Sequence, residues 1–186
     1  QPGLQINYNF NPNISANTNY VNDVENRTRN NNWGIGVSVY KSKENKFDFN
    51  IGQNATYVTS TSSIRPDVVT KFWTTETNIS GSVQLPKKIS ITSSVEYLWR
   101  QKTPVFPDNN NAFIWHAGVE KNIFKKKDIK LGFRVNDILN QNLGFRRNVT
   151  SNFVSERTYN VIRRFWLVTF SWSFNKGPQK AEADNW

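Results

Sequence analysis

Residues 166–174 read WLVTFSWSF, and every second side chain of this stretch is large and apolar. The members of that apolar set are Trp166, Val168, Phe170, Trp172 and Phe174. Because successive side chains of a β-strand point to opposite faces, a period of two predicts a strand with one apolar face. The question is whether the rest of the chain repeats the pattern.

The pattern recurs eight times upstream, so nine strands are predicted. Their apolar phases cover residues 4–10, 14–20, 33–39, 47–57, 73–85, 89–99, 113–119 and 129–135. The opposite phase is polar or small, as in Ser90, Thr92, Ser94 and Glu96. Several strands run to about ten residues, which is the length a tilted strand needs to cross a bilayer. The predicted fold class is all-β, an antiparallel up-and-down transmembrane β-barrel.

Composition agrees with a barrel and excludes other classes. Aromatic residues make up 14% of the chain, yet no run of 18 apolar residues occurs, so no transmembrane helix is predicted. The mean hydropathy of −0.66 is low because a barrel strand gives only alternate residues to lipid. The chain has no cysteine, which excludes disulfides, thiolate metal sites and thiol nucleophiles.

The connections between the predicted strands alternate in length. Residues 11–13, 42–45, 86–88 and 125–128 form short turns, whereas residues 23–32, 60–70, 103–111 and 140–163 form longer links. Outer-membrane barrels place short turns on the periplasmic side. With a first strand running toward the periplasm, the ninth strand also ends there, which predicts a periplasmic C-terminus. Residues 1–175 are therefore assigned to the barrel, and residues 176–186, where the alternation is lost, to a periplasmic tail.

Aromatic side chains gather at the predicted strand ends, on the apolar phase. The expected outer girdle is Tyr20, Trp33, Tyr57, Trp73, Trp99 and Phe113. A sparser inner set is Phe10, Phe47, Trp172 and Phe174. Two aromatic belts are typical of the two membrane interfaces.

The polar phase carries the residues that would line a lumen. They are Glu76, Glu96, Arg100, His116, Glu120 and Arg134. His116 is the only histidine, and no partner residues for a metal site or a catalytic triad are suggested. We interpret the carboxylates as lumen charges that neutralise neighbouring cations, and we expect neither enzymatic activity nor a cofactor.

The net charge of +10 is concentrated at the predicted short turns. The clusters are Lys41, Lys43 and Lys46; Lys87 and Lys88; and Lys125, Lys126 and Lys127. A nucleic-acid surface would interleave cations with aromatic side chains, whereas here the two kinds lie at different strand ends. Attraction to anionic headgroups is the simpler interpretation, and no nucleic-acid partner is expected.

The segment 135–142, VNDILNQN, is followed by a polar loop, by Arg163 and Arg164, and by the alternating aromatic strand. This order resembles the C-terminal end of the TonB-dependent-receptor-like outer-membrane β-barrel family of Bacteroidetes. The match is moderately specific over residues 129–174, and the upstream hairpins are similar only in style. Members of that family are much longer, with a plug before the barrel, and no TonB box is identified here.

The resemblance implies a role in the wall of a channel or surface receptor that takes up a nutrient or other ligand. The implied partners are outer-membrane lipid, further barrel strands and a plug, the barrel-assembly machinery and a surface lipoprotein. The machinery would recognise the terminal strand through its apolar set, Trp166, Val168, Phe170, Trp172 and Phe174. Contacts at the cell surface are expected in the loop 140–163, from Phe145, Arg146, Arg147, Phe153 and Tyr159.

Three alternatives stay open at the level of sequence. Bacterial barrels usually have an even number of strands, so nine strands indicate either that the first is not real or that partner strands complete the barrel. The second explanation is favoured. A self-contained small barrel with a structural or adhesive role, or a soluble basic β-sheet module that binds nucleic acid or glycans, are the other possibilities.

Overall fold

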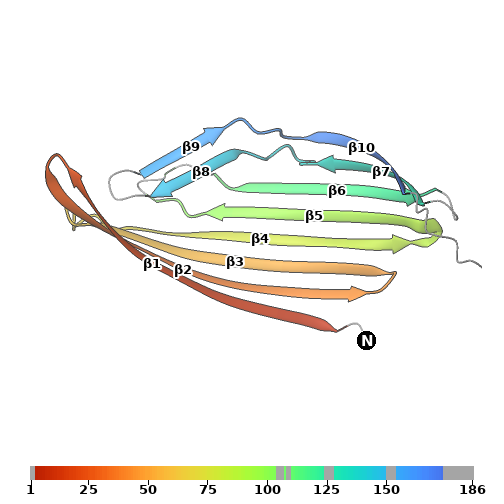
Figure 1. Cartoon of the computed structure of the whole chain (residues 1–186), viewed down its shortest axis with the longest axis horizontal. Helices are drawn as coiled ribbons and strands as arrows, with labels where there is room; N and C mark the ends of the chain where they lie inside the picture. Colours follow the sequence, from red (N-terminus) through yellow and green to blue (C-terminus); the bar gives the residue numbers. More distant parts are fainter. Residues whose placement is uncertain (1–2, 104–106, 108–109, 124–127, 150–153, 174–186) are drawn as a thin grey trace, which may run out of the picture.

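The computed structural model describes residues 3–103, 107, 110–123, 128–149 and 154–173 (Figure 1). These residues form ten strands and one 3₁₀ turn, η1 (Pro86–Lys88). The strands are β1 (Leu4–Val21), β2 (Val24–Lys43), β3 (Phe47–Ser62), β4 (Thr70–Leu85), β5 (Ile89–Arg100), β6 (Ala112–Asn122), β7 (Asp128–Asn136), β8 (Gly144–Val149), β9 (Val154–Tyr159) and β10 (Phe165–Ser173).

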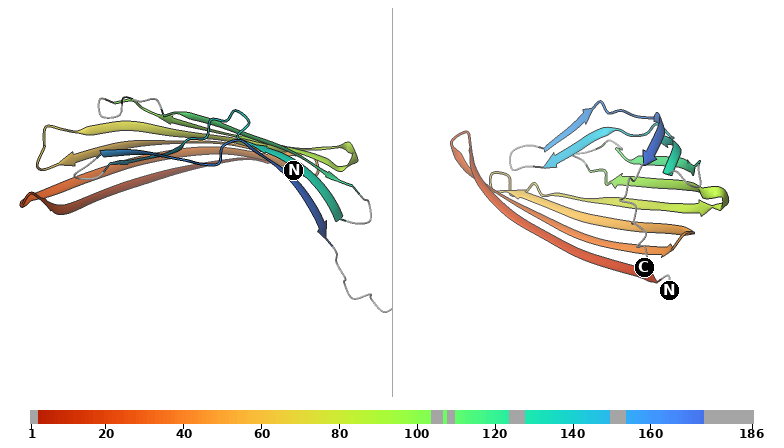
Figure 2. Two further views of the ribbon diagram at one scale, coloured as in Figure 1. Left: turned by 90° about the horizontal axis from the view of Figure 1, so that it is seen from above. Right: turned by 45° about the vertical axis from the view of Figure 1, so that its right-hand side comes forward.

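Eight of these strands make one antiparallel sheet in the order β1-β2-β3-β4-β5-β6-β7-β10. Neighbours in the sheet are also neighbours in the chain, except that β10 returns to β7 after the separate β8–β9 hairpin. The up-and-down, all-β fold class is therefore confirmed. Among the described residues β1 and β10 each pair on one side only, and the sheet arches between these two edges (Figure 2).

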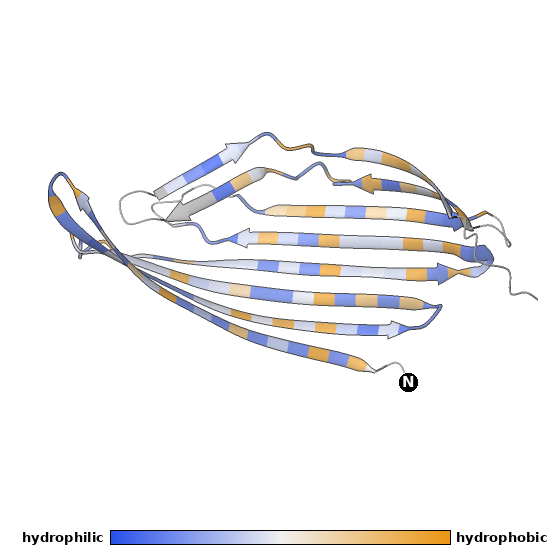
Figure 3. Cartoon of the chain, in the orientation of Figure 1, coloured by the Kyte–Doolittle hydropathy of each residue, from blue (hydrophilic) through white to orange (hydrophobic). Residues whose placement is uncertain are grey.

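The register places the alternating residues of all eight strands on common faces. Residues directly opposite each other in an antiparallel pair share a face, and Phe133, for example, lies opposite both Val119 and Val168. Figure 3 shows apolar and polar residues alternating along each strand. One face of the sheet is thus mainly apolar over the described strands, and the other is mainly polar.

Very few apolar side chains are buried. Those in the described part are Phe72, Ala112 and Ile114, and all three lie on the polar phase. On the apolar face Tyr8 is 88% exposed and Val168 is 72% exposed. Burying apolar surface is the main driving force for folding in water, so a sheet with an exposed apolar face needs a nonaqueous environment. No described helix has the length and apolarity to span a membrane.

Two features of the predicted N-terminal topology are wrong. No turn occurs at residues 11–13, and residues 24–32 of the expected loop belong to β2. The pairing of β1 with β2 runs without a break from Leu4 opposite Lys41, through Pro12 opposite Trp33, to Val21 opposite Val24. Among the described strands β1 is an edge strand, which is the position in a sheet where proline is most often found.

The actual reversal is the two-residue turn Asn22–Asp23. Both residues adopt left-handed backbone conformations, with φ of 50° and 62°. This is the type I′ geometry that suits a two-residue hairpin, and Asn and Asp tolerate it better than most residues. The predicted first two strands are thus one, and the direction of residues 4–10 is opposite to the one expected.

The corrected sheet has a consistent pair of ends. The short turn at Asn45, η1, the N-terminal end of β1 and the C-terminal end of β10 all lie at one end, shown on the right in Figure 1. The Asn22–Asp23 turn, the connection 63–69, the C-terminal ends of β5 and β7 and the N-terminal end of β6 lie at the other. We call these the short-turn end and the loop end. The expected loop 140–163 also differs, because it contains β8 and β9.

Candidate functional site

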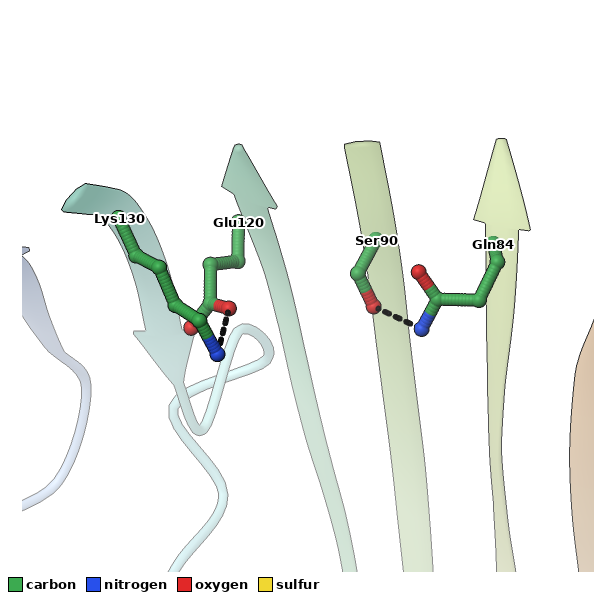
Figure 4. Close-up of polar contacts among 4 residues, drawn as sticks. All are labelled: Gln84, Ser90, Glu120 and Lys130. Carbon is green, nitrogen blue, oxygen red and sulfur yellow. Dashed lines mark hydrogen bonds and ion pairs between the residues drawn. The ribbon is translucent and has the colours of Figure 1, made fainter. Parts of the chain in front are cut away.

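The concave face of the sheet carries the polar phase of every strand. All six sequence-predicted lumen residues lie on this face by register, but they are spread over β4 to β7 and do not form one cluster. Among the described residues, Lys130 Nζ and Glu120 Oε1 form an ion pair of 3.5 Å near the short-turn end (Figure 4). At the same end, Gln84 Nε2 donates a hydrogen bond of 3.0 Å to Ser90 Oγ. Neutralisation of a lumen charge is thus seen directly between Lys130 and Glu120.

The β8–β9 hairpin folds over this concave face (Figure 2). The ring of Phe145, in β8, lies 4.6 Å from the guanidinium carbon of Arg100, in β5, which is a cation–π contact. From β9, Glu156 Oε2 accepts a hydrogen bond of 3.3 Å from Asn110 Nδ2. The hairpin is therefore held on the inner side of the wall instead of projecting outward from it.

Arg100 is the centre of these contacts. Its Nη1 donates to the backbone oxygen of Asn110 at 2.6 Å, and its backbone N–H donates to Asn111 Oδ1 at 2.9 Å. Together with Phe145, these bonds join strand β5, the connection 101–111 and the hairpin. We call this set of contacts the Arg100 junction. The sequence identified Arg100 as a lumen residue but carried no sign of this linking role.

A cavity of about 480 Å³ lies between the hairpin and the wall. Its lining residues on the concave phase and in β8 include the polar Asn32, Asn54, Thr56, Thr74, Glu76, Arg100 and Arg146 and the apolar Val58, Phe72, Leu98 and Phe145. Ligand sites typically combine an apolar surface with a few convergent polar groups. The volume falls in the range of small-molecule sites.

Six of the cavity-lining residues are arranged in two rows across β3, β4 and β5. One row is Thr56, Thr74 and Arg100, and the other is Asn54, Glu76 and Leu98. Glu76 Oε1 accepts a hydrogen bond of 2.7 Å from Asn78 Nδ2. Within the described part of the chain, the side chains of Asn32, Asn54, Thr56 and Thr74 make no hydrogen bond, so their amide and hydroxyl groups remain available to a ligand.

Gly36 makes room for part of this lining. A Cβ at this position would lie 2.3 Å from Oδ1 of Asn54 and 2.7 Å from Nδ2 of Asn9. The side chain of Asn54 therefore lies across the backbone of β2, over the space that a larger residue would fill.

The VNDILNQN segment forms a closed turn at the loop end of β7. Asp137 is only 2% exposed, and its carboxylate accepts backbone N–H groups of Gln141 and Asn142, each at 2.9 Å. Its own N–H donates to Nδ1 of His116 at 3.2 Å. We call this the Asp137 turn. His116 thus acts as a hydrogen-bond acceptor for the backbone, and the role of Asp137 was not predicted from the sequence.

The Asp137 turn also positions the last strand. Arg164 donates from its backbone N–H to Asn140 Oδ1 at 3.3 Å and from Nη1 to the backbone oxygen of Ile138 at 3.4 Å. Residue 165 then begins the pairing of β10 with β7, where Phe165 lies opposite Asn136. The conspicuous motif is therefore a structural turn that brings β10 back beside β7 after the hairpin.

Five of the expected outer aromatic residues lie in the part of the apolar face toward the loop end, although Trp33 is in the middle of β2 and not at its end, because β2 begins at Val24. Trp33, Tyr57 and Trp73 form one direct row across β2, β3 and β4, and the rings of Tyr57 and Trp73 are 4.9 Å apart. Trp99 lies opposite Thr75, and Phe113 lies opposite Tyr97. The last of the six, Tyr20, is apart from this row because it lies opposite Glu25, close to the Asn22–Asp23 turn.

The inner aromatic set is less regular. Phe47 stacks on Phe49 near the short-turn end, with ring centroids 6.4 Å apart, and Trp172 lies opposite Ile129. Phe10 was expected at this end, but it stacks on Trp33 at 6.0 Å because β1 continues through residues 11–13. Phe174 lies outside the described residues.

The expected surface residues of the loop have several locations. Phe145 and Arg146 line the cavity, and Tyr159, at the base of the hairpin opposite Gly144, is 52% exposed. Arg147 lies opposite Glu156 in the register of β8 and β9. Phe153 lies outside the described residues. The sequence placed these side chains on a surface loop, whereas the structure directs two of them toward the concave face.

The described side chains of the terminal apolar set lie on the convex face. Trp166, Val168, Phe170 and Trp172 are between 52% and 72% exposed and lie opposite the apolar phase of β7.

In the part of the chain that the structure describes, no group of three or more His, Asp or Glu side chains is arranged to hold a metal ion.

Comparison with known proteins gives one match. Residues 2–172 match the model of the outer membrane protein beta-barrel family. No curated protein and no solved structure matched the chain. The family match covers nearly all of the chain, and it agrees with the antiparallel sheet and its exposed apolar face. The chain therefore belongs to the outer membrane protein β-barrel family, which places it in the outer membrane with its apolar face in contact with lipid.

Proposed function

We propose that this chain forms part of the wall of a ligand-uptake channel or surface receptor similar to TonB-dependent receptors, in a bacterium of the Bacteroidetes, and that it is not an enzyme. The observation that carries the proposal is the cavity between the β8–β9 hairpin and the concave face. A barrel that served only as a membrane anchor would not need a hairpin folded against its inner wall.

The wall belongs to a barrel of more than eight strands. Backbone groups at a strand edge must be paired within lipid, and β1 has 18 residues whereas β10 has 9. The lumen of an eight-stranded barrel is just wide enough for the side chains that fill it. Here the concave face already accommodates a two-stranded hairpin and a cavity of about 480 Å³.

The short-turn end is the periplasmic end in this proposal, and β10 ends there. This orientation follows the general pattern of short periplasmic turns and longer external loops. The partners are those that the resemblance implies: further barrel strands and a plug, a surface lipoprotein, and the barrel-assembly machinery, which would contact β10.

A self-contained eight-stranded barrel is the second candidate, because the main sheet has an even number of strands. Pairing of β1 with β10 would close it. The family assignment leaves no support for the soluble binding module.

Disulfide trapping separates the two candidates, and the absence of cysteine from the chain keeps the background clean. Cysteines replace Asn9 in β1 and Thr169 in β10, and the protein is oxidised in outer membranes. The expected result is no bond between them, whereas the control pair Asn7→Cys and Ser38→Cys, which lie directly opposite each other in β1 and β2, should form a disulfide. A β1–β10 bond formed as efficiently as the control would overturn the larger barrel.

Ion conductance tests the uptake role directly. The protein is inserted into planar bilayers in KCl, with and without the double substitution Arg100→Ala and Phe145→Ala, which removes the Arg100 junction. Release of the hairpin should increase the frequency or size of channel openings. An unchanged conductance record, with correct insertion shown by surface labelling, would contradict a pathway along the concave face.

A further inference from the structure

Charged residues of the main sheet are segregated between its two faces. On the polar concave phase, acids and bases are mixed, as with Glu76, Glu96, Glu120, Arg100 and Arg134. On the apolar phase of the eight strands, every charged residue except Glu25 is a cation. The cations are Arg27, Arg29, Lys41, Lys43, Lys71 and Lys121.

Three of these cations lie beyond the aromatic row at the loop end. Lys71 is two residues from Trp73 on the same face of β4, which is about 7 Å along the strand. Arg29 is four residues beyond Trp33 in β2, and Arg27 is two residues further. We call Arg27, Arg29 and Lys71 the cationic patch.

Neutral hydrogen-bonding side chains fill the space between the three cations. Asn31 and Lys71 lie on either side of Thr59, and Thr61 lies opposite Arg29. Asn31 Nδ2 donates to Thr59 Oγ1 at 3.3 Å. The patch therefore joins cations to amide and hydroxyl groups on a surface that continues the lipid-facing side of the wall.

The cations of the patch have no acidic partner among the described residues. All three are exposed, and the single ion pair of the described chain lies on the opposite face and at the opposite end. On the concave face acidic residues lie among the basic ones, whereas the acidic residue nearest to the patch in β2 is Glu25, which forms no ion pair with it among the described residues.

The backbone beneath the patch is held rigidly from the other face. Asn26 and Thr28 are each 1% exposed, and Asn26 Oδ1 accepts a hydrogen bond of 2.6 Å from Ser62. The N–H of Arg27 donates to Ser63 Oγ at 2.8 Å, and the backbone oxygen of Arg27 accepts from the N–H of Ser63 at 3.0 Å. The strand segment that carries both arginines is thus fixed before any ligand binds.

We infer that the cationic patch binds the phosphate groups of lipopolysaccharide in the outer leaflet. Headgroups begin where the hydrocarbon ends, and the headgroup layer is about 5–7 Å deep on each side of the membrane. Lys71 lies at this depth beyond the aromatic row, while strand tilt and the length of the arginine side chains bring Arg29 and Arg27 toward it. Arginine binds phosphate with two parallel hydrogen bonds, which makes this pair well suited to such groups.

The inference rests on the proposed orientation, in which the loop end faces the cell exterior. It is independent of the hairpin and its cavity, so failure of the uptake role would not affect it.

The test uses the protein purified from outer membranes in a nonionic detergent. Binding of fluorescent lipopolysaccharide is measured and compared with binding of the same molecule after chemical removal of its phosphates. The variant Arg27→Gln, Arg29→Gln and Lys71→Gln removes the patch. The matched control, Lys41→Gln with Lys43→Gln, removes cations from the same face at the short-turn end.

The patch variant should bind phosphorylated lipopolysaccharide roughly 100-fold more weakly than the unmodified protein, because each basic residue contributes about fivefold at an anionic surface. The control variant should change affinity by about twofold or less. Dephosphorylated lipopolysaccharide should bind all three proteins equally weakly. The conservative variant Arg27→Lys with Arg29→Lys should fall between the extremes, because it keeps charge but loses the bidentate geometry.

Equal affinities of the patch variant and the unmodified protein would overturn the inference, as would equal binding of the phosphorylated and dephosphorylated forms. A loss confined to the control variant would overturn it too, and would indicate a reversed orientation. Impermeant thiol labelling of Asp67→Cys at the loop end checks that orientation separately.

Discussion

The eight-stranded wall and the segment 137–164 of this chain are stabilised in different ways. In the wall, each strand repeats the same apolar alternation, and neighbouring strands place it on a common face. The segment 137–164 has no such repetition, and its structure depends on a few individual bonds at Asp137, Arg100 and Phe145. The fold of the wall is therefore specified by many equivalent residues, whereas the fold of the segment depends on each of a few contacts. Four substitutions test this difference.

The largest effect is expected for Val168→Arg, on the apolar face of β10. A charge on the lipid side of a barrel strand costs about 2–4 kcal/mol near the middle of the bilayer. Urea titration of folding into liposomes should show this loss of stability.

The matched control for that substitution is Thr169→Arg, one position along the strand on the concave phase. It should cost less than about 1 kcal/mol, because charges on the lumen side remain in a polar environment. Equal costs at the two positions would contradict the assignment of the faces.

Asp137→Ala should destabilise the segment but not the wall. It removes the acceptor of two backbone N–H groups, and the expected local cost is about 2–3 kcal/mol. Hydrogen exchange at Gln141 and Asn142 should become about 30- to 150-fold faster, since about 1.4 kcal/mol corresponds to a factor of ten. Exchange in β3 and β4 should stay the same, and faster exchange there would refute the separation of the two regions.

Phe145→Ala should loosen the hairpin by about 1 kcal/mol, through loss of the contact with Arg100. Spin labels on Thr158 and Thr92 can measure the distance between hairpin and wall by electron paramagnetic resonance. The distribution should broaden toward longer distances, whereas Phe145→Trp, which keeps an aromatic face, should preserve the shorter ones. Identical distributions for Phe145→Ala and the unmodified protein would show that the contact between Phe145 and Arg100 does not hold the hairpin against the wall.

The smallest effect is expected for the Lys130–Glu120 ion pair of the wall. Both side chains are 49% exposed, and exposed pairs contribute about 0–1 kcal/mol. Glu120→Gln should therefore shift stability by less than about 0.5 kcal/mol, a shift that salt abolishes. A loss as large as that of Asp137→Ala would show that single contacts can dominate in the wall as well.

The same difference explains which parts of the structure could be predicted from sequence. Alternation over many residues identified the strand-forming regions of the main sheet and its two faces, because a single misread residue does not change the pattern, but it did not reveal β8 and β9. The reversal at Asn22–Asp23 was missed because Pro12 is a stronger local signal for a turn, and only the pairing of β1 with β2 shows that this edge strand continues through it.

The site was less predictable than the wall. Glu76 and Arg100 were recognised as lumen residues from their phase alone, but the contact of Arg100 with Phe145 joins positions 45 residues apart that no local pattern relates. The VNDILNQN segment stood out as a family signature, yet its role became clear only when the Asp137 carboxylate was seen to accept two N–H groups. Alternation reveals which face a residue occupies, not which segment covers it.

The Arg100 junction has a thermodynamic consequence for the cavity. Because Arg100 is bonded both to the connection 101–111 and to the hairpin, the free energies of opening these two segments are linked. A solute that enters the cavity and favours the open hairpin must then also favour release of the connection 101–111. By reciprocity, a partner that binds that connection changes the affinity of the cavity for the solute by the same factor as the solute changes the affinity for the partner. In the proposed orientation, Arg100 would thus couple occupancy of the cavity on the concave face to the end of the barrel that faces the exterior.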